Sequence, residues 1–180
     1  AAIGKVVAET DARFILDSCQ TAGVVPIHMD QWGVDVLVYT GHKGLFGPMG
    51  IGGMIVGPDV EIRPSRVGGT GVNSISPFQP DEYPYRLETG THCLPGIAGL
   101  NAAQKWFAEL GKSHGAADDA SHTDICALAL AHIHETENAS TKTLLDAFSA
   151  IDGVKIYGPD RKSTRLNSSH SSVSRMPSSA

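Results

Sequence analysis

The chain has 180 residues and a mass of 18.9 kDa, which favours one domain, and 41% hydrophobic residues are enough for a core. Its formal net charge of −5 argues against a general nucleic-acid binder. No run approaches about 20 apolar residues, so we expect no membrane-spanning helix and no membrane partner. The three widely spaced cysteines, Cys19, Cys93 and Cys126, disfavour a disulfide scaffold and favour a reducing, cytoplasmic compartment.

The first half of the chain predicts three strands. Residues 13–17 form a short apolar run closed by a carboxylate, which indicates a buried strand, and residues 34–40 are β-branched and apolar. After a Gly/Pro-rich loop over residues 41–50, residues 51–56 predict a third strand. Residues 63–85 are rich in Gly, Pro, Ser and Asn without periodicity, which predicts a long functional surface loop.

The second half predicts helices. Residues 94–110 carry apolar side chains at helical spacing, with a proline near the start and a glycine after the end. Residues 123–151 predict a second helical stretch, with a break near residues 138–140 as an open alternative. Residues 154–157 suggest that a new strand begins there. Strands that alternate with helices predict an α/β fold with a parallel or mixed sheet.

The composition changes sharply after Pro159. Residues 161–180 hold eight serines, four basic residues and no acidic residue, and they show no periodicity. One interpretation is a disordered Ser/Arg-rich tail. The other is an artefact, because residues 160–170 (DRKSTRLNSSH) and 174–180 (SRMPSSA) resemble a short-read sequencing adapter translated in one frame. We therefore predict that residues 160–180 are an artefactual or disordered tail outside the fold.

Two groups of polar residues follow neighbouring predicted strands. Asp17 and Gln20 come after the first, and Thr40, His42 and Lys43 come after the second. Ligands of open α/β sheets gather at the carboxyl ends of strands, so these groups can face one pocket. Pyridoxal phosphate (PLP) needs a lysine for a Schiff base, an acid for its pyridine nitrogen, and donors for its phenolic oxygen and phosphate. The set points to PLP, and the glycines around the lysine would let the cofactor approach the backbone.

Each of these residues also has a simpler interpretation. Lys43 can be a solvated loop lysine, and Asp17 can cap the turn that follows its strand. Residues 47–50 can be only a turn. The glycine spacing fits neither a Walker phosphate loop nor the dinucleotide-binding pattern. On the residues alone, a structural α/β domain without a cofactor remains an alternative.

A resemblance to a known family adds to this evidence. The strings ILDSCQTAG, YTGHKGLFGPMGIGGMIV, GGTGVNS, RLETGT and GIAGL, in this order, resemble the cysteine desulfurase branch of the class V aminotransferases. The similarity runs from about residue 3 to Pro159. It implies part of the large domain of a fold-type I PLP-dependent transferase, with a mostly parallel sheet flanked by helices. Residues 1–150 would be the C-terminal half of that domain, truncated at its N-terminus, and residues 151–159 would begin the small C-terminal domain.

The resemblance implies a role for each residue of the cluster. Lys43 would hold PLP and move the α-proton of an amino-acid substrate. Asp17 would pair with the pyridinium nitrogen, and Gln20 would donate to the phenolic oxygen. Thr40 and His42 would reach the phosphate.

The resemblance also implies partners and a reaction. Thr70 would reach the phosphate bound by the other subunit of a homodimer, which would place the loop over residues 63–85 at the interface. The reaction would convert L-cysteine to L-alanine and leave sulfur on the enzyme for a sulfur-acceptor protein. A selenocysteine lyase, a transaminase, an epimerase or a non-catalytic PLP-binding protein are the alternatives.

The chain departs from the family pattern in places. Cys19 stands where a small residue is usual, and residues 91–93 (Thr-His-Cys) replace a Thr followed closely by Asn. The family's persulfide cysteine and substrate-binding arginine belong to segments outside this chain. We therefore expect the fragment to be inactive alone.

Two further groups call for interpretation. Arg86 and Glu88 are expected to form an ion pair that fixes the turn at Gly90. A set of histidines and one cysteine invites a metal site, but a structural zinc site needs four matched ligands and no CxxC spacing is present. We therefore predict no metal site there and place these side chains on the wetter side of a helix. The set is His114, His122, Cys126, His132 and His134.

Overall fold

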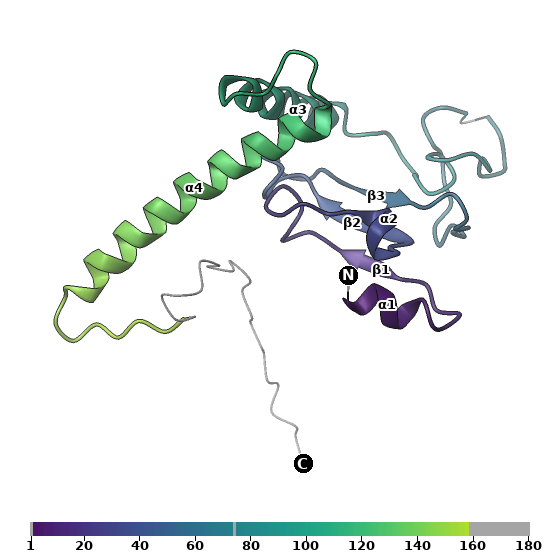
Figure 1. Ribbon diagram of the computed structural model, residues 1–180. Helices are drawn as coiled ribbons and strands as arrows, with labels where there is room; N and C mark the ends of the chain where they lie inside the picture. The colour runs from purple at the N-terminus through teal and green to yellow at the C-terminus, as the bar shows by residue number, and fades with distance from the viewer. Residues whose placement is uncertain (1, 74, 159–180) are drawn as a thin grey trace. The chain divides into compact units, whose positions relative to one another are not determined.

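The computed structural model describes residues 2–73 and 75–158 (Figure 1). The predicted tail over residues 160–180 lies outside the described residues. The chain divides into two compact units, one up to Glu109 and one from Leu110 onward. The elements in chain order are α1 (Ala2–Val7), β1 (Ile15–Asp17), α2 (Met29–Trp32), β2 (Val36–Thr40), β3 (Gly52–Val56), α3 (Leu94–Ser113) and α4 (His122–Ser149).

The described sheet has three strands in the order β1-β2-β3. β1 pairs in parallel with β2, with Ile15 opposite Val36, whereas β2 pairs antiparallel with β3, with Thr40 opposite Gly52. The α/β class is confirmed. Within the described residues the sheet is mixed rather than mostly parallel, because the connection over residues 41–51 is too short for the crossover that a parallel pair requires.

Burial differs between the strands. Val36 and Leu37 of β2 are 3% and 7% exposed, and they form part of the core with Phe107 of α3. Ile15 of β1 is 62% exposed, so the expectation of a buried first strand is wrong. The physical reason is its place at an edge of the described sheet, where β2 is its one strand neighbour.

Both predicted helices form. α3 begins at Leu94 as predicted and runs three residues past the predicted end. α4 passes without interruption through residues 138–140, because Asn and Ser in a helix interior cost only about 0.5 kcal/mol each relative to Ala. Ser121 caps α4, since its hydroxyl accepts the backbone N–H of Asp124 at 3.2 Å.

The structure contradicts the strand expected over residues 154–157 and agrees with the expected long loop. Residues 154–157 form no strand, because no described strand lies beside them to complete a ladder. The described part of residues 57–93 contains neither helix nor strand, which agrees with the predicted long loop. No described helix is long and apolar enough to span a membrane.

Candidate functional site

The ends of β1 and β2 bring the two predicted groups to the same edge of the sheet. The strands are parallel, and Asp17, the last residue of β1, lies opposite Val38. Thr40 ends β2 two residues further on, and His42 and Lys43 follow directly. The parallel pairing therefore places the carboxylate and the lysine at neighbouring strand ends, as the sequence predicts.

Hydrogen bonds from Ser18 and to Asp17 fix the turn that follows β1. Ser18 is fully buried, and its backbone N–H and its hydroxyl both donate to the Val38 carbonyl oxygen at 2.8 Å. The Asp17 Oδ1 atom accepts the Cys19 N–H at 2.9 Å. The carboxylate thus caps the turn after its strand, as the simpler interpretation predicts, and it stays exposed at the sheet edge.

The electrostatic environment lowers the pKa of Asp17. Hydrogen bonds from the Cys19 thiol and then from the Cys19 backbone N–H hold the pKa of the Asp17 carboxyl below its usual range, and the positive charge of Lys43 adds to this. Desolvation opposes the shift and is outweighed. Asp17 therefore carries a full negative charge at neutral pH.

Cys19 supports the carboxylate as a hydrogen-bond donor. Its thiol donates to Asp17, which raises the thiol pKa, and desolvation and the Asp17 charge raise it further. Lys43 and a backbone contact to Thr40 act in the opposite direction. The residue that departs from the family pattern is therefore a neutral thiol in contact with both sides of the cluster.

Lys43 lies in a short loop whose ends are tied together. The Gly41 N–H donates to the Ile51 carbonyl oxygen at 2.8 Å, and the Gly47 N–H donates to the Gly41 carbonyl oxygen at 2.7 Å. Inside the loop, the Phe46 N–H donates to the Lys43 carbonyl oxygen at 2.9 Å. The backbone around the lysine is thus closed, while its side chain is exposed.

Two further contacts hold this loop. The Thr40 Oγ1 and His42 Nδ1 atoms are 2.9 Å apart, so the hydroxyl and the imidazole form one polar pair. Phe46 has a φ of 56°, and its ring lies 5.4 Å from that of Trp106 and 5.6 Å from that of Phe107, centroid to centroid. These aromatic contacts attach the loop to α3 and hold a backbone conformation that costs about 1–2 kcal/mol for a non-glycine residue.

The glycines beside Lys43 serve protein packing. A Cβ atom on Gly44 would lie 2.5 Å from the Ala22 carbonyl oxygen, and one on Gly41 would lie 2.6 Å from Ile51 Cγ2. The expectation that these glycines give a cofactor access to the backbone stays a prediction. Gly44 is required because the loop after β2 packs directly on the turn after β1, and Gly41 is required because it packs against Ile51 at the end of its own loop.

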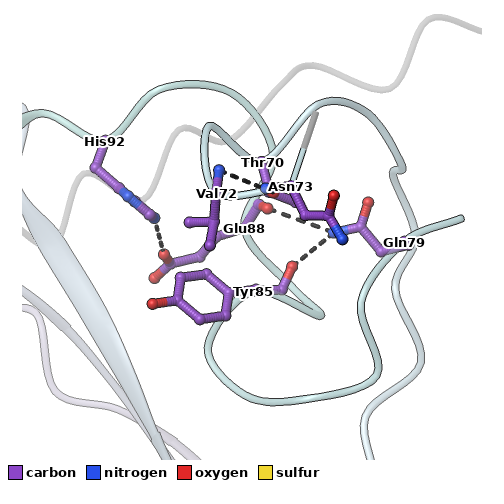
Figure 2. A network of polar contacts seen from close by, with 7 residues as sticks. All are labelled: Thr70, Val72, Asn73, Gln79, Tyr85, Glu88 and His92. Atoms are coloured by element: carbon purple, nitrogen blue, oxygen red, sulfur yellow. Dashed lines mark hydrogen bonds and ion pairs between the residues drawn. The ribbon is translucent and has the colours of Figure 1, made fainter. Parts of the chain in front are cut away.

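Gln20 and Thr70 stand apart from this set. Gln20 lies exposed in the turn after β1. Thr70 is 2% exposed, and its hydroxyl accepts the N–H groups of Val72 and Asn73 at 3.3 Å, within its own loop (Figure 2). No described hydrogen bond joins Thr70 to the loop that carries Lys43.

The pairing expected for Arg86 and Glu88 is wrong. Arg86 pairs with Glu61 at 2.9 Å, and the Glu88 carboxylate pairs with the His92 imidazole (Figure 2). Glu88 and His92 are four residues apart across the turn at Gly90, and their pairing was not among the expectations from the sequence. In the sequence, the four-residue spacing of an acid and a histidine was the one sign of this pair.

Four of the five side chains in the predicted histidine and cysteine set lie in two pairs. The rings of His114 and His132 lie 3.7 Å apart, centroid to centroid, and His122 Nε2 lies 3.5 Å from Cys126 Sγ. Among residues 2–73 and 75–158, no group of three or more His, Cys, Asp or Glu side chains is arranged to hold a metal ion.

The cluster at the strand ends has the donor set that PLP requires. Asp17 is ionised and can retain a proton on a pyridine nitrogen, while Lys43 is an exposed amine. Thr40 and His42 form a hydroxyl–imidazole pair suited to an oxyanion. The residues present therefore fit the cofactor.

Known proteins with similar sequences share one function in their names. A probable cysteine desulfurase of Methanothermobacter thermautotrophicus is 26% identical over 160 residues, which cover 87% of this chain and 36% of the relative. A cysteine desulfurase of Klebsiella pneumoniae is 28% identical over 156 residues, with 84% and 34% covered. The chain spans about a third of the length of these relatives.

Solved structures agree with the sequences. The apo cysteine desulfurase of Thermococcus onnurineus NA1 matches with a TM-score of 0.59 at 25% identity, covering 88% of this chain and 36% of that one. The cysteine desulfurase CsdA of Escherichia coli matches with a TM-score of 0.57 at 25% identity, covering 81% and 33%. These neighbours identify the α/β arrangement as part of a fold-type I PLP enzyme. The class-V aminotransferase profile matches residues 1–175, and the chain therefore belongs to the class-V aminotransferase family.

Proposed function

We propose that the cluster at the ends of β1 and β2 binds PLP, and that the full-length protein is a cysteine desulfurase that converts L-cysteine to L-alanine and enzyme-bound sulfur. One observation carries the proposal. The ionised Asp17 carboxylate and the Lys43 amine lie at neighbouring ends of two parallel strands, close enough for the lysine charge to act on the acid. Family membership and the names of the relatives support the reaction.

The proposed roles follow from the chemistry of each side chain. Bound PLP supplies an electron sink for charge that develops at the substrate α-carbon. Lys43 holds the cofactor and then moves the proton at that carbon, because an amine at the end of a flexible stem can serve both contacts. Asp17 keeps the ring nitrogen protonated, and the hydrogen bonds from Cys19 lower the pKa of Asp17. Thr40 and His42 bind the phosphate as one polar pair.

The remaining assignments belong to the same proposal. Gln20 binds the phenolic oxygen of the cofactor from the turn after β1. Thr70 binds the phosphate of a second subunit through the proton of its hydroxyl, which requires a homodimer and exposure of a side chain that is now 2% exposed. The proposal also includes a sulfur-acceptor protein, a cytoplasmic location and a division of the chain near residue 150.

The first test is PLP binding by the full chain, followed by the visible absorbance of the bound cofactor. We expect the visible absorbance band of lysine-bound PLP, and Lys43→Ala should abolish it. Lys105→Ala is the matched control, because Lys105 is an exposed lysine on α3, and it should keep the band. A band that persists in Lys43→Ala would end the assignment of the lysine.

The reaction is tested separately. Alanine release from L-cysteine, measured on the full-length protein, distinguishes a desulfurase from a protein that binds PLP without catalysis. Release of alanine that Lys43→Ala removes supports the proposal. Normal PLP binding without alanine release would refute the desulfurase activity and leave the cofactor site intact.

A further inference from the structure

Phe46 has a backbone conformation that its side chain disfavours. Among residues 2–73 and 75–158 it is the one residue other than glycine with a positive φ, 56°. A glycine would adopt this conformation freely, whereas a bulky aromatic residue is strained in it. Strained residues concentrate at functional sites, and Phe46 lies three residues after Lys43 in the same loop. The position therefore calls for a reason why the chain has a phenylalanine there.

The φ of Phe46 controls two hydrogen bonds that close the loop. The Phe46 N–H donates to the Lys43 carbonyl oxygen at 2.9 Å, which closes a turn that begins at the lysine. The next amide, the Gly47 N–H, donates to the Gly41 carbonyl oxygen at 2.7 Å. Because the φ of Phe46 sets the direction of the chain between these two N–H groups, a different φ would break one bond or the other. The conformation of Phe46 thus determines the backbone from which the Lys43 side chain extends.

The ring of Phe46 holds this conformation in place. Its centroid lies 5.4 Å from that of Trp106, with an interplanar angle of 48°, and 5.6 Å from that of Phe107, edge to face at 72°. Aromatic pairs at these separations attract each other beyond the effect of the area they bury. Phe107 is 3% exposed and belongs to the core, whereas Phe46 is 51% exposed. The ring therefore ties the loop to a fixed part of α3, and its replacement leaves the core closed.

The residues after Phe46 pack on the same helix. A Cβ atom on Gly47 would lie 2.9 Å from Leu100 Cδ1, and one on Gly99 would lie 2.7 Å from Pro48 Cγ. Residues 46–48 are thus seated along α3, and the ring of Phe46 is the part of this contact nearest in sequence to the lysine.

We propose that Phe46 is a positioning residue of the PLP site: its ring, held against Trp106 and Phe107, fixes the turn that presents the Lys43 amine. Phe46 acts through the backbone of that turn. This inference rests on the proposed function, because Lys43 needs a fixed position only if it bonds to the cofactor.

Three variants of the full chain separate the ring from the backbone. Phe46→Gly removes the ring and relieves the strain, Phe46→Ala removes the ring and keeps the strain, and Phe46→Tyr keeps the ring. After PLP is added, the C=N bond to Lys43 is reduced with borohydride at successive times, and mass spectrometry gives the labelled fraction. We expect bond formation to be about tenfold slower in Phe46→Gly and Phe46→Ala, since a misplacement of about 1 Å can cost up to about 100-fold. Phe46→Tyr should react as fast as the parent.

Hydrogen exchange gives a second readout, which needs no cofactor. The Gly47 N–H should exchange about tenfold faster in Phe46→Gly than in the parent, because the loop has lost its aromatic anchor and opens more often. Phe148→Ala is the matched control, since it removes a similarly exposed ring, 44% exposed, from α4. This control should change neither the exchange at Gly47 nor the reaction of Lys43.

The outcomes distinguish this inference from the proposed function. If Phe46→Gly reacts with PLP as fast as the parent, the backbone conformation alone matters and the role of the ring is refuted. If Phe46→Ala lowers the urea midpoint and leaves the rate of bond formation unchanged, Phe46 is structural only, which also refutes the proposal. A parent chain that forms no bond to PLP refutes the cofactor site itself, and the role of Phe46 in it.

Discussion

Gly44→Ala tests whether backbone packing positions the proposed catalytic lysine. Gly44 follows Lys43 directly, and the added Cβ would lie 2.5 Å from the Ala22 carbonyl oxygen and 2.8 Å from Val24 Cγ2. The valine methyl belongs to a side chain that can move. The carbonyl belongs to the backbone of the turn after β1, so one of the two loops must shift.

The size of the effect follows from the overlap. Carbon–oxygen contacts of this kind are essentially never below 3.0 Å, so the backbone must move by about half an ångström. Such overpacking costs about 1–3 kcal/mol, whereas alanine recovers about 0.4–1 kcal/mol by restricting the unfolded chain. We expect a net loss of about 1–2 kcal/mol. A displacement of this size beside Lys43 should weaken PLP binding about tenfold, since sites tolerate only about 0.5 Å of misplacement.

Two measurements on the same protein check both consequences. Urea unfolding gives the loss of stability, and a PLP titration followed by absorbance gives the change in affinity. Gly158→Ala is the control, because its Cβ would meet nothing within 4 Å. If Gly44→Ala unfolds at the same urea concentration and binds PLP as tightly as the parent, the idea that the glycine contact sets the position of the lysine is refuted.

Two further predictions follow from the titrating groups. Asp17→Asn should speed alkylation of Cys19 by iodoacetamide at a fixed pH, because loss of the carboxylate removes the main cause of the raised thiol pKa. Cys126, whose pKa is raised by burial, is the internal control, and its rate of alkylation should not change. The Phe14 N–H (2.7 Å) and then Arg13 (2.9 Å) hold the pKa of Asp35 below its usual value. This stabilisation is present above about pH 4, near the unfolded pKa, and is lost as the pH falls through the folded pKa. Asp35→Asn should therefore lower the urea midpoint at pH 7, and the difference from the parent should shrink on acidification; a difference independent of pH would contradict this.

Elements with strong local patterns could be predicted from the sequence, and elements that depend on neighbours could not. β2 and α3 have long apolar runs, and both form within a few residues of the predicted bounds. Residues 154–157 have the same β-branched character as β2, yet a strand also needs a partner, which local sequence does not specify. The short helices α1 and α2 were missed because four to six residues carry too little pattern.

The features of the site likewise differ in how far the sequence could predict them. Asp17, Thr40 and Lys43 could be placed together because the parallel pairing of two recognisable strands forces their ends to one edge. The donor role of Cys19 could not be predicted, because it depends on the direction of one thiol in a turn. Two ion pairs depend on how a long irregular loop folds back on itself: Glu88 with His92, and Arg86 with Glu61. The sequence of such a loop has no periodicity from which these contacts could be predicted.

The geometry of the proposed cofactor site rests mainly on backbone contacts. A Cβ on Gly23 would lie 2.0 Å from the Gly44 carbonyl oxygen, and the Gly44 Cβ would meet the Ala22 carbonyl oxygen, so the loops after β1 and β2 touch without side chains between them. Ser18 adds two hydrogen bonds from the end of β1 to β2. Main-chain atoms have far fewer conformations than side chains, which makes such contacts stiff. The separation between the end of β1, which carries the carboxylate, and the backbone that carries Lys43 is therefore set before any ligand binds, as a site that must hold one rigid ring requires.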